Sequence, residues 1–422
     1  MSGKHAWMGW LVALALAGGT GCDDDSGLDP TPGGDAGTDA GSTDAGGADA
    51  GDDGGMAAPS LRILGSTAEF GSPEDEDSSL FLFDPATGTV EETPDANDDT
   101  DSVVDRAGEV PLLLARQLGR VHVQDPNEPL STLRTIDINP DDAIPDAGPA
   151  PELAANPQTV VPLASDRAYV VPRARDELVV IDTRPAGEAD PQDEVDLSPL
   201  AAEGDMDGVD PSDAVKVGDR VYVTLARSWY DVATCSMQFE GSVLAVVDST
   251  DDSLVDLDDA TDGVQGIELD ANVNSAGLVH DAANDRLLVV AQGALGDLDG
   301  GIEEIDLTTD ESQGLVLTET ELDGDVAGLA WVSETRAYVR LAPEYDMDFT
   351  EVEPSKVFVW NPSTGDVDDT PLATDVDGML VHEDVLYLWS EGTLAQRNAT
   401  TGEEIDSTTA STLPVFSAAA LP

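Results

Sequence analysis

The sixteen residues RAYVVPRARDELVVID, at positions 167–182, hold the pattern that decides the fold. Two short apolar runs rich in β-branched residues, Ala168–Val171 and Leu178–Ile181, are separated by a polar loop. Runs of this kind, bounded by turn residues, are typical of β-strands. Arg167 opens the first run and Asp182 ends the second, so the stretch predicts two antiparallel strands joined by a short loop.

The second run, an apolar strand that ends in Asp or Asn, recurs along the chain. Turn residues often follow it, as in Asn361-Pro-Ser-Thr-Gly365, where Pro presets the first corner and Gly accepts a positive φ. We call the final Asp or Asn the turn mark. The seven turn marks are Asp84, Asp125, Asp182, Asp248, Asp306, Asn361 and Asn398. Their mean spacing of about 52 residues is close to the length of one propeller blade.

The first run recurs as well, ahead of the second in most repeats. Its further copies are Arg220-Val-Tyr-Val-Thr, Arg286-Leu-Leu-Val-Val, Arg336-Ala-Tyr-Val-Arg and Val385-Leu-Tyr-Leu-Trp. A two-residue turn such as Gly218-Asp219 or Asn284-Asp285 precedes it, and another apolar stretch lies before that turn. Each repeat therefore reads as strand A, turn, strand B, loop, strand C, turn mark and strand D. Seven repeats predict an all-β fold, a seven-bladed β-propeller of four-stranded blades over residues 61–422.

A Tyr-Val strand followed by a Val-Ile-Asp strand, as in residues 167–182, resembles the repeats of YVTN-type proteins. The resemblance covers residues 61–422. It implies the architecture of the blade and no particular chemistry.

The two ends of this region predict how the ring closes. The first repeat has strands B, C and D at Leu61–Leu64, Leu80–Phe83 and Thr89–Glu92, and it lacks strand A. An apolar strand, Leu413–Leu421, is left over after the seventh repeat. We expect it to fill the missing position, which would remove both exposed sheet edges.

Residues 1–21 have the layout of a secretory signal: Lys4, an apolar run from Ala6 to Ala17 and small residues before Cys22. The run is too short to cross a bilayer, which takes about 20 residues. The end of this segment resembles the lipobox of bacterial lipoproteins, although Gly19 stands where that family prefers Leu. The resemblance implies lipid attachment at Cys22. Ordinary cleavage, with Cys22 incidental, is the alternative.

Residues 22–60 predict a disordered tether between the lipid and the propeller. Residues 23–58 contain ten Asp and no basic residue, in a low-complexity setting that cannot bury apolar area. We therefore expect an exported protein, anchored to a bacterial membrane through its lipid, on the periplasmic or cell-surface side.

Charge excludes one class of partner. The 422 residues include 87 acidic and 18 basic side chains, a net charge of −69, whereas nucleic-acid binding needs a basic surface. From Leu61 onward the chain still has 77 acidic and only 17 basic residues. An acidic surface of this kind favours solubility at high ionic strength, so a saline habitat is one explanation. The other explanation is an acidic surface that binds cations.

Candidate catalytic residues are few, and we name no catalytic site. His280 and His382 follow a Leu-Val pair at similar places in two repeats, which favours a structural role, and His122 stands alone. Cys235 is expected to be a small buried residue. No Gly-x-Ser-x-Gly, His-Glu-x-x-His or phosphate-loop motif is present. The four Arg that open strand B (Arg167, Arg220, Arg286 and Arg336) are expected to hold hairpin ends.

Two acidic stretches resemble the start of a calcium loop. They are Asp205-Met-Asp207-Gly208 and Asp297-Leu-Asp299-Gly300, and neither continues with a third ligand and a Glu at the twelfth position. We therefore expect no metal and no cofactor, with calcium as the less favoured alternative.

One face of the propeller is expected to recognise a partner. Strand B to strand C (B–C) loops and strand D to strand A (D–A) connections share a face, and the B–C loops of repeats four to six are long. The candidate binding residues on this face are Arg173, Arg175, Arg227, Trp229, Tyr230, Tyr345 and Phe349. The leading hypothesis is a monomeric binding or scaffold propeller for a protein or glycan. The alternative is a lactonase-like or quinoprotein-like enzyme with a metal or cofactor at the central channel.

Overall fold

The structure is a computed structural model that describes residues 61–69, 77–94, 99, 101–139, 154–201, 208–231, 236–258, 260–273, 277–294, 296–345 and 350–421. The predicted signal, Cys22 and the tether lie outside these residues. In the part of the chain that is described, no helix is long and apolar enough to cross a membrane.

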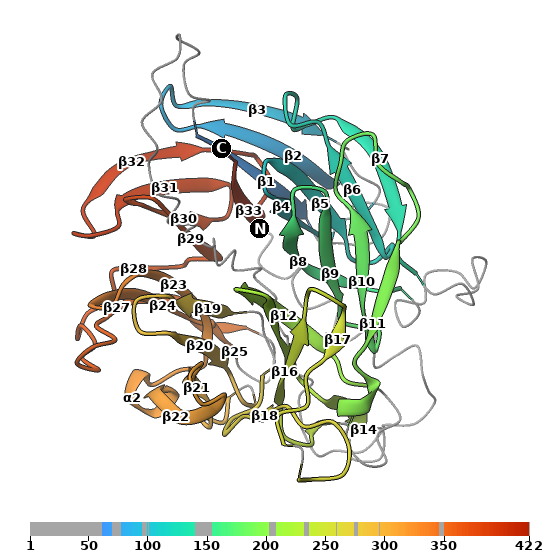
Figure 1. The fold of residues 1–422 in the computed structure, drawn as a ribbon. Coiled ribbons are helices and arrows are strands. Elements are labelled where there is room, and N and C mark those ends of the chain that lie inside the picture. Colours follow the sequence, from blue (N-terminus) through green and yellow to red (C-terminus); the bar gives the residue numbers. More distant parts are fainter. Residues whose placement is uncertain are drawn as a thin grey trace, which may run out of the picture.

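Seven four-stranded antiparallel sheets follow one another around a ring, so the predicted all-β, seven-bladed propeller is confirmed (Figure 1). Strands are given from inner to outer, A to D. Blade 1 has β33 (Val415–Leu421), β1 (Arg62–Glu69), β2 (Asp77–Asp84) and β3 (Thr89–Pro94). Blade 2 has β4 (Ser102–Ala107), β5 (Val110–Ala115), β6 (Arg120–Gln124) and β7 (Thr132–Asp137). Blade 3 has β8 (Pro157–Ala164), β9 (Arg167–Pro172), β10 (Glu177–Asp182) and β11 (Asp193–Asp196).

The remaining blades have the same order of strands. Blade 4 has β12 (Pro211–Val217), β13 (Arg220–Leu225), β16 (Val243–Asp248) and β17 (Ser253–Leu254), and β18 (Ile267–Glu268) also pairs with β16. Blade 5 has β19 (Leu278–Asp281), β20 (Arg286–Ala291), β21 (Gly301–Asp306) and β22 (Glu311–Thr318), followed by the short helix α2 (Glu319–Leu322). Blade 6 has β23 (Val326–Ser333), β24 (Arg336–Leu341), β27 (Lys356–Trp360) and β28 (Ala373–Thr374). Blade 7 has β29 (Gly378–His382), β30 (Val385–Ser390), β31 (Thr393–Asn398) and β32 (Glu404–Thr409).

The C-terminal strand closes the ring as predicted. β33 pairs antiparallel with β1, with Ile63 opposite Ala420 and Gly65 opposite Ala418. Every residue of β33 is buried. Strand A of the first blade therefore comes from the opposite end of the chain, and the first and last strands of the propeller pair within one sheet.

Seven apolar clusters among the described residues hold the ring together, one at each junction between neighbouring blades. At the junction of blades 5 and 6, for example, Val290 and Leu288 pack in one cluster with Val339 and Trp360. Both faces of the middle strands, B and C, are thus covered. This explains why these strands read as continuous apolar runs and do not alternate with polar residues.

All seven turn marks open a turn after strand C, as predicted. Each uses its side chain to accept a hydrogen bond from the backbone N–H two residues later, for example from Ala86 to Asp84 at 2.8 Å and from Thr308 to Asp306 at 2.7 Å. The other five turns are closed in the same way. This bond sets the turn between strands C and D, the C–D turn.

The four arginines that open strand B were expected to hold hairpin ends, and two of them, Arg167 and Arg220, contact the next blade instead. Arg167 and Tyr169 of blade 3 both contact the carboxylate of Asp252 in the C–D turn of blade 4. Arg220 and Tyr222 of blade 4 contact Asp310 in the C–D turn of blade 5 in the same way, at 2.6 and 3.2 Å. We call this arrangement the Arg–Tyr clasp.

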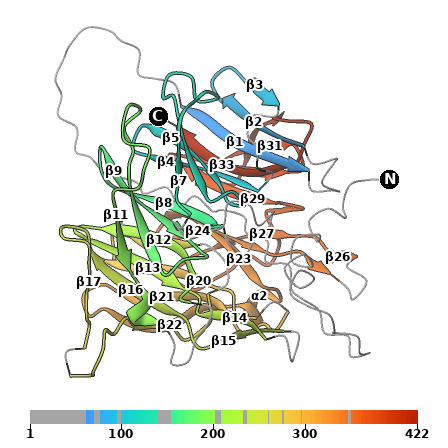
Figure 2. The ribbon, with the colours of Figure 1, turned by 90° about the vertical axis from the view of Figure 1, so that its right-hand side faces the viewer.

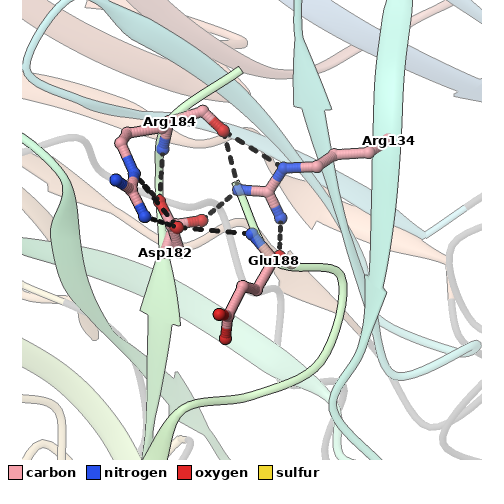
Figure 3. A network of polar contacts seen from close by, with 4 residues as sticks. All are labelled: Arg134, Asp182, Arg184 and Glu188. Carbon is pink, nitrogen blue, oxygen red and sulfur yellow. Dashed lines mark hydrogen bonds and ion pairs between the residues drawn. The ribbon is translucent and has the colours of Figure 1, made fainter. Parts of the chain in front are cut away.

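Related contacts tie two other junctions. The Tyr338 hydroxyl of blade 6 donates to the Ala399 carbonyl in the C–D turn of blade 7 at 2.7 Å. At the junction of blades 2 and 3, the guanidinium of Arg134 on β7 lies among the backbone carbonyls of Asp182, Arg184 and Glu188 (Figure 3). The clasp is an electrostatic contact between blades that the sequence pattern alone did not assign.

One predicted turn is wrong. In blade 5 Asp281 pairs with Arg286, so the turn between strands A and B spans residues 282–285 and not only Asn284 and Asp285. The additional residues bring the carboxylate of Asp281 beside Arg286, whose Nε donates to it at 2.9 Å. Arg286 therefore does hold its own hairpin end.

Candidate functional site

Two additional hairpins rise from the B–C connections of blades 4 and 6. β14 (Ser228–Asp231) pairs with β15 (Ser236–Phe239), and β25 (Glu344–Tyr345) pairs with β26 (Glu351–Glu353). Strand B runs in one direction in every blade, so both hairpins emerge on the same face of the ring, together with the D–A connections. Figure 2 shows β26 at the edge of the molecule opposite β17. We call the face of the ring from which both hairpins emerge the hairpin face.

The structure places the predicted binding residues unevenly on this face. Trp229 and Tyr230 lie on β14, where Trp229 is opposite Gln238, and Tyr345 ends β25. Phe349 lies outside the described residues. Tyr345 is half-buried, and burial together with the nearby Glu351 raises its pKa.

The predicted arginines have structural partners. Arg175 is largely buried; its Nη2 lies 2.7 Å from Glu194, and its Nη1 donates to the Ile138 carbonyl at 2.8 Å. The backbone N–H of Arg173 donates to the Asn156 carbonyl at 3.0 Å, and Arg227 has a φ of 51° at the base of the β14–β15 hairpin. These three arginines therefore help to hold the loops of the hairpin face in place.

An Asp or Asn directly before strand A recurs on the hairpin face, and the sequence reasoning missed it. The carbonyls of Asp101, Asn156, Asp210 and Asp325 accept the equivalent backbone N–H at the end of strand B in blades 2, 3, 4 and 6. Their side chains then hold neighbouring segments. Asp210, for example, accepts from the Ser228 backbone N–H at 3.1 Å and from its hydroxyl at 2.8 Å, which anchors the β14–β15 hairpin. In blades 3, 4 and 6 the available signal was an Asp or Asn ten or eleven residues before the Arg that opens strand B.

Several carboxyls on this face are buried, and burial raises the pKa of each. The pKa of Asp99 and that of Glu319 rise to about 7, and that of Asp377 rises to about 6. Each accepts backbone N–H groups: Glu319 accepts from Gly300 at 2.9 Å and Val326 at 2.8 Å. Perturbed groups often mark functional sites, but these acids also tie the connections of the face together.

Arg340 is a buried cation on this face. It is 4 % exposed, and its Nη2 donates to the Ala327 carbonyl at 2.9 Å. Burial lowers its pKa to about 10, and the charge of Asp377 opposes that shift. The two groups bring opposite charges to the junction of blades 6 and 7, below the β25–β26 hairpin.

The described residues hold no group of three or more His, Cys, Asp or Glu side chains arranged for a metal ion. The Oδ1 of Asp299 accepts a hydrogen bond from the Ala294 N–H at 2.9 Å. Asp205 and Asp207 lie outside the described residues. His280 and His382 lie on the inner strands β19 and β29, and burial lowers the pKa of both. His122 contacts the Thr135 hydroxyl at 2.9 Å.

No protein-family model matches the chain, and no curated protein matches it in sequence. Solved structures that resemble it include apo AztD from Citrobacter koseri, with 10% identity, 85% of this chain and 98% of that chain covered and a TM-score of 0.46. The β-propeller domain of Cps50 (Swd1) from Myceliophteria thermophila has 13% identity, 82% and 97% coverage and a TM-score of 0.48. A candidate 6-phosphogluconolactonase from Bacteroides fragilis has 9% identity, 86% and 98% coverage and a TM-score of 0.49. The fold assignment made above rests on the sheets themselves.

Proposed function

We propose that this protein is an exported, lipid-anchored binding or scaffold propeller that recognises a protein or glycan partner through its hairpin face. The observation that carries the proposal is the β25–β26 hairpin. It stands outside the four-stranded blade, and its Val352 is 52% exposed, one of the three large apolar side chains that are exposed among the described residues. Connections that project from a rigid scaffold carry binding residues more often than the strands they join, and this hairpin offers a partner an apolar side chain.

The chemistry of the face favours binding over catalysis. Its buried carboxyls, including Glu319 and Asp377, accept backbone N–H bonds and so hold loops in place. Around Val352 the hairpin carries Glu351 and Glu353, and Tyr345 lies opposite Glu351. Apolar, aromatic and acidic groups in one projection suit a partner that offers an apolar patch with hydrogen-bond donors or positive charge at its rim.

The anchor is a separate part of the proposal. Acylation of Cys22 would tie the chain to a membrane, and the acidic segment before Leu61 would separate the propeller from the lipid headgroups. We expect the Cys22→Ala variant to leave the membrane fraction while the wild-type protein stays in it after a high-salt wash. A variant that remains with the membranes after this wash would contradict lipid anchoring.

The hairpin is tested by replacing residues 344–353 with a short Gly-Ser linker. These residues connect β24 to β27 outside the sheet of blade 6, so the variant should keep the melting temperature of the wild-type protein. We expect it to lose the partner that the wild-type protein retains from native membranes. Retention of the same partner by the folded variant would count against this face.

A further inference from the structure

Five carboxyl groups gather on the hairpin face, where the B–C loop of blade 5 meets the start of blade 6. They are Asp297 and Asp299 of that loop, Glu319 of α2, Asp325 directly before β23, and Glu344 of β25. Burial raises the pKa of Asp325, and the negative charges of Glu344, Asp299 and Asp297 raise it further. None of the ion pairs between described residues includes one of the five groups. We call these groups the Asp325 cluster.

Asp325 is the member of the cluster that points to a ligand. Its side chain is 9% exposed, and its Oδ2 accepts the Gly296 N–H at 2.8 Å. Its Oδ1 is enclosed and accepts no hydrogen bond from any described residue. Glu319, by contrast, uses both of its oxygens, one for the Gly300 N–H and one for the Val326 N–H. A buried polar atom without a partner is rare because its desolvation is not compensated, and an ion or a water molecule is a common explanation.

The charges around this oxygen favour a cation over a neutral donor. A water molecule would satisfy Oδ1 but would leave the charges of the neighbouring carboxylates uncompensated. Asp297, Asp299 and Glu344 are exposed while Asp325 is buried, so the cluster extends from the surface to the unpartnered oxygen. The motif Asp297-Leu-Asp299-Gly300, which resembles the start of a calcium loop, therefore belongs to a cluster with a buried acceptor.

We propose that the Asp325 cluster binds a calcium ion. Calcium takes carboxylate, carbonyl and water oxygens in a flexible geometry. The described carboxylates do not form a group of three around one metal position, so Asp325 Oδ1 is the direct ligand and the exposed groups act through water bound to the ion. A site with few direct protein ligands binds weakly, with a dissociation constant of about 10⁻⁴–10⁻³ M, as in extracellular calcium modules. The proposal does not depend on the partner of the hairpin face.

The test is a calorimetric titration of the full chain in detergent with CaCl₂ and with MgCl₂, at constant ionic strength and after a chelator has removed divalent ions. We expect one saturable calcium site above the diffuse binding of cations to the acidic surface. Magnesium should bind at least about fivefold more weakly, because it needs a regular octahedral site and loses its water reluctantly. Absence of a saturable calcium site would overturn the proposal, and equal affinity for magnesium would overturn the choice of calcium.

Matched variants place the site. Asp325→Asn removes the charge and keeps an oxygen for the Gly296 N–H. Asp210→Asn makes the same change directly before strand A of blade 4, where the carboxylate accepts from Ser228. We expect the first to weaken calcium binding at least about tenfold, because calcium affinity depends on the charge of its ligands, and the second to leave it unchanged. Glu344→Gln changes an exposed residue of β25, so it should fold, and it should weaken binding about twofold. Equal calcium affinity of the two Asn variants, or unchanged affinity of Glu344→Gln, would overturn the assignment to this cluster.

Discussion

At the scale of single residues, buried carboxyls decide how this protein responds to pH. Burial raises the pKa of Asp99, Asp213 and Glu319 to about 7, while their ordinary values are near 4. The pKa of Asp182 shifts the other way, to about 2, because Arg184 donates to its carboxylate. The folded state therefore binds more protons than the unfolded state between about pH 4 and pH 7, and fewer below about pH 4.

We expect the free energy of unfolding to fall as pH rises from about 4.5 to 7.5. A raised folded pKa means that ionisation costs more in the folded state, so the stability that these acids lend is present at low pH and is lost through the folded pKa. Urea unfolding at several pH values measures it. The variant Glu319→Gln, which keeps the shape without the ionisation, should flatten the profile by about 1 kcal/mol or more, since one pKa unit corresponds to about 1.4 kcal/mol.

A matched control is Glu91→Gln on the exposed strand β3, which should leave the pH profile unchanged. A stability that rises steadily from pH 4.5 to 7.5 in the wild-type protein would contradict the placement of these buried acids.

At the scale of the elements, most strands could be predicted from the sequence, and the connections could not. Strands B and C are covered on both faces by neighbouring blades, so Arg167–Pro172 and Glu177–Asp182 read as unbroken apolar runs. The turn marks were visible because each closes its turn with its own side chain. The β25–β26 hairpin carries polar residues on both sides of Val352, so its pairing left no apolar pattern to find.

The binding sites were harder still to predict, for a physical reason. The predicted face could be chosen from loop length, but the residues that shape it, such as Asp210 and Asp325, act through bonds to distant backbone groups.

Ring closure is the element whose loss should matter most. We expect truncation after Thr412, which removes β33, to make the whole protein aggregate or become sensitive to protease. All seven residues of β33 are buried, and losing several apolar side chains at about 1.5–3 kcal/mol each approaches the whole stability of a typical domain. Limited proteolysis measures it.

A second experiment on ring closure adds β33 back to the truncated protein as a peptide. A peptide of residues 413–422 supplied to the truncated protein should restore some protease resistance if the strand position alone is missing. A truncated protein that melts like the full chain would mean that β33 does not hold the ring together.

At the scale of the whole molecule, the excess of negative charge causes electrostatic repulsion within the folded protein. From Leu61 onward the chain carries 60 more acidic than basic residues. We expect the melting temperature at pH 7.5 to rise between low salt and about 1 M NaCl, where the Debye length falls to ~3 Å. At pH 4.5, where many carboxyls are protonated, the same salt series should have a smaller effect. A melting temperature independent of salt at pH 7.5 would show that repulsion does not limit this fold.

The central claim is that the hairpin face meets a partner at the membrane. Site-specific photo-crosslinking in cells tests it most directly, with the photoreactive residue at Val352 on the hairpin or at Ala86 in the C–D turn of blade 1, on the opposite face. Both side chains are exposed. We predict a discrete crosslinked product from position 352 and none from position 86. Absence of a product at 352, or the same product from both positions, would contradict the claim.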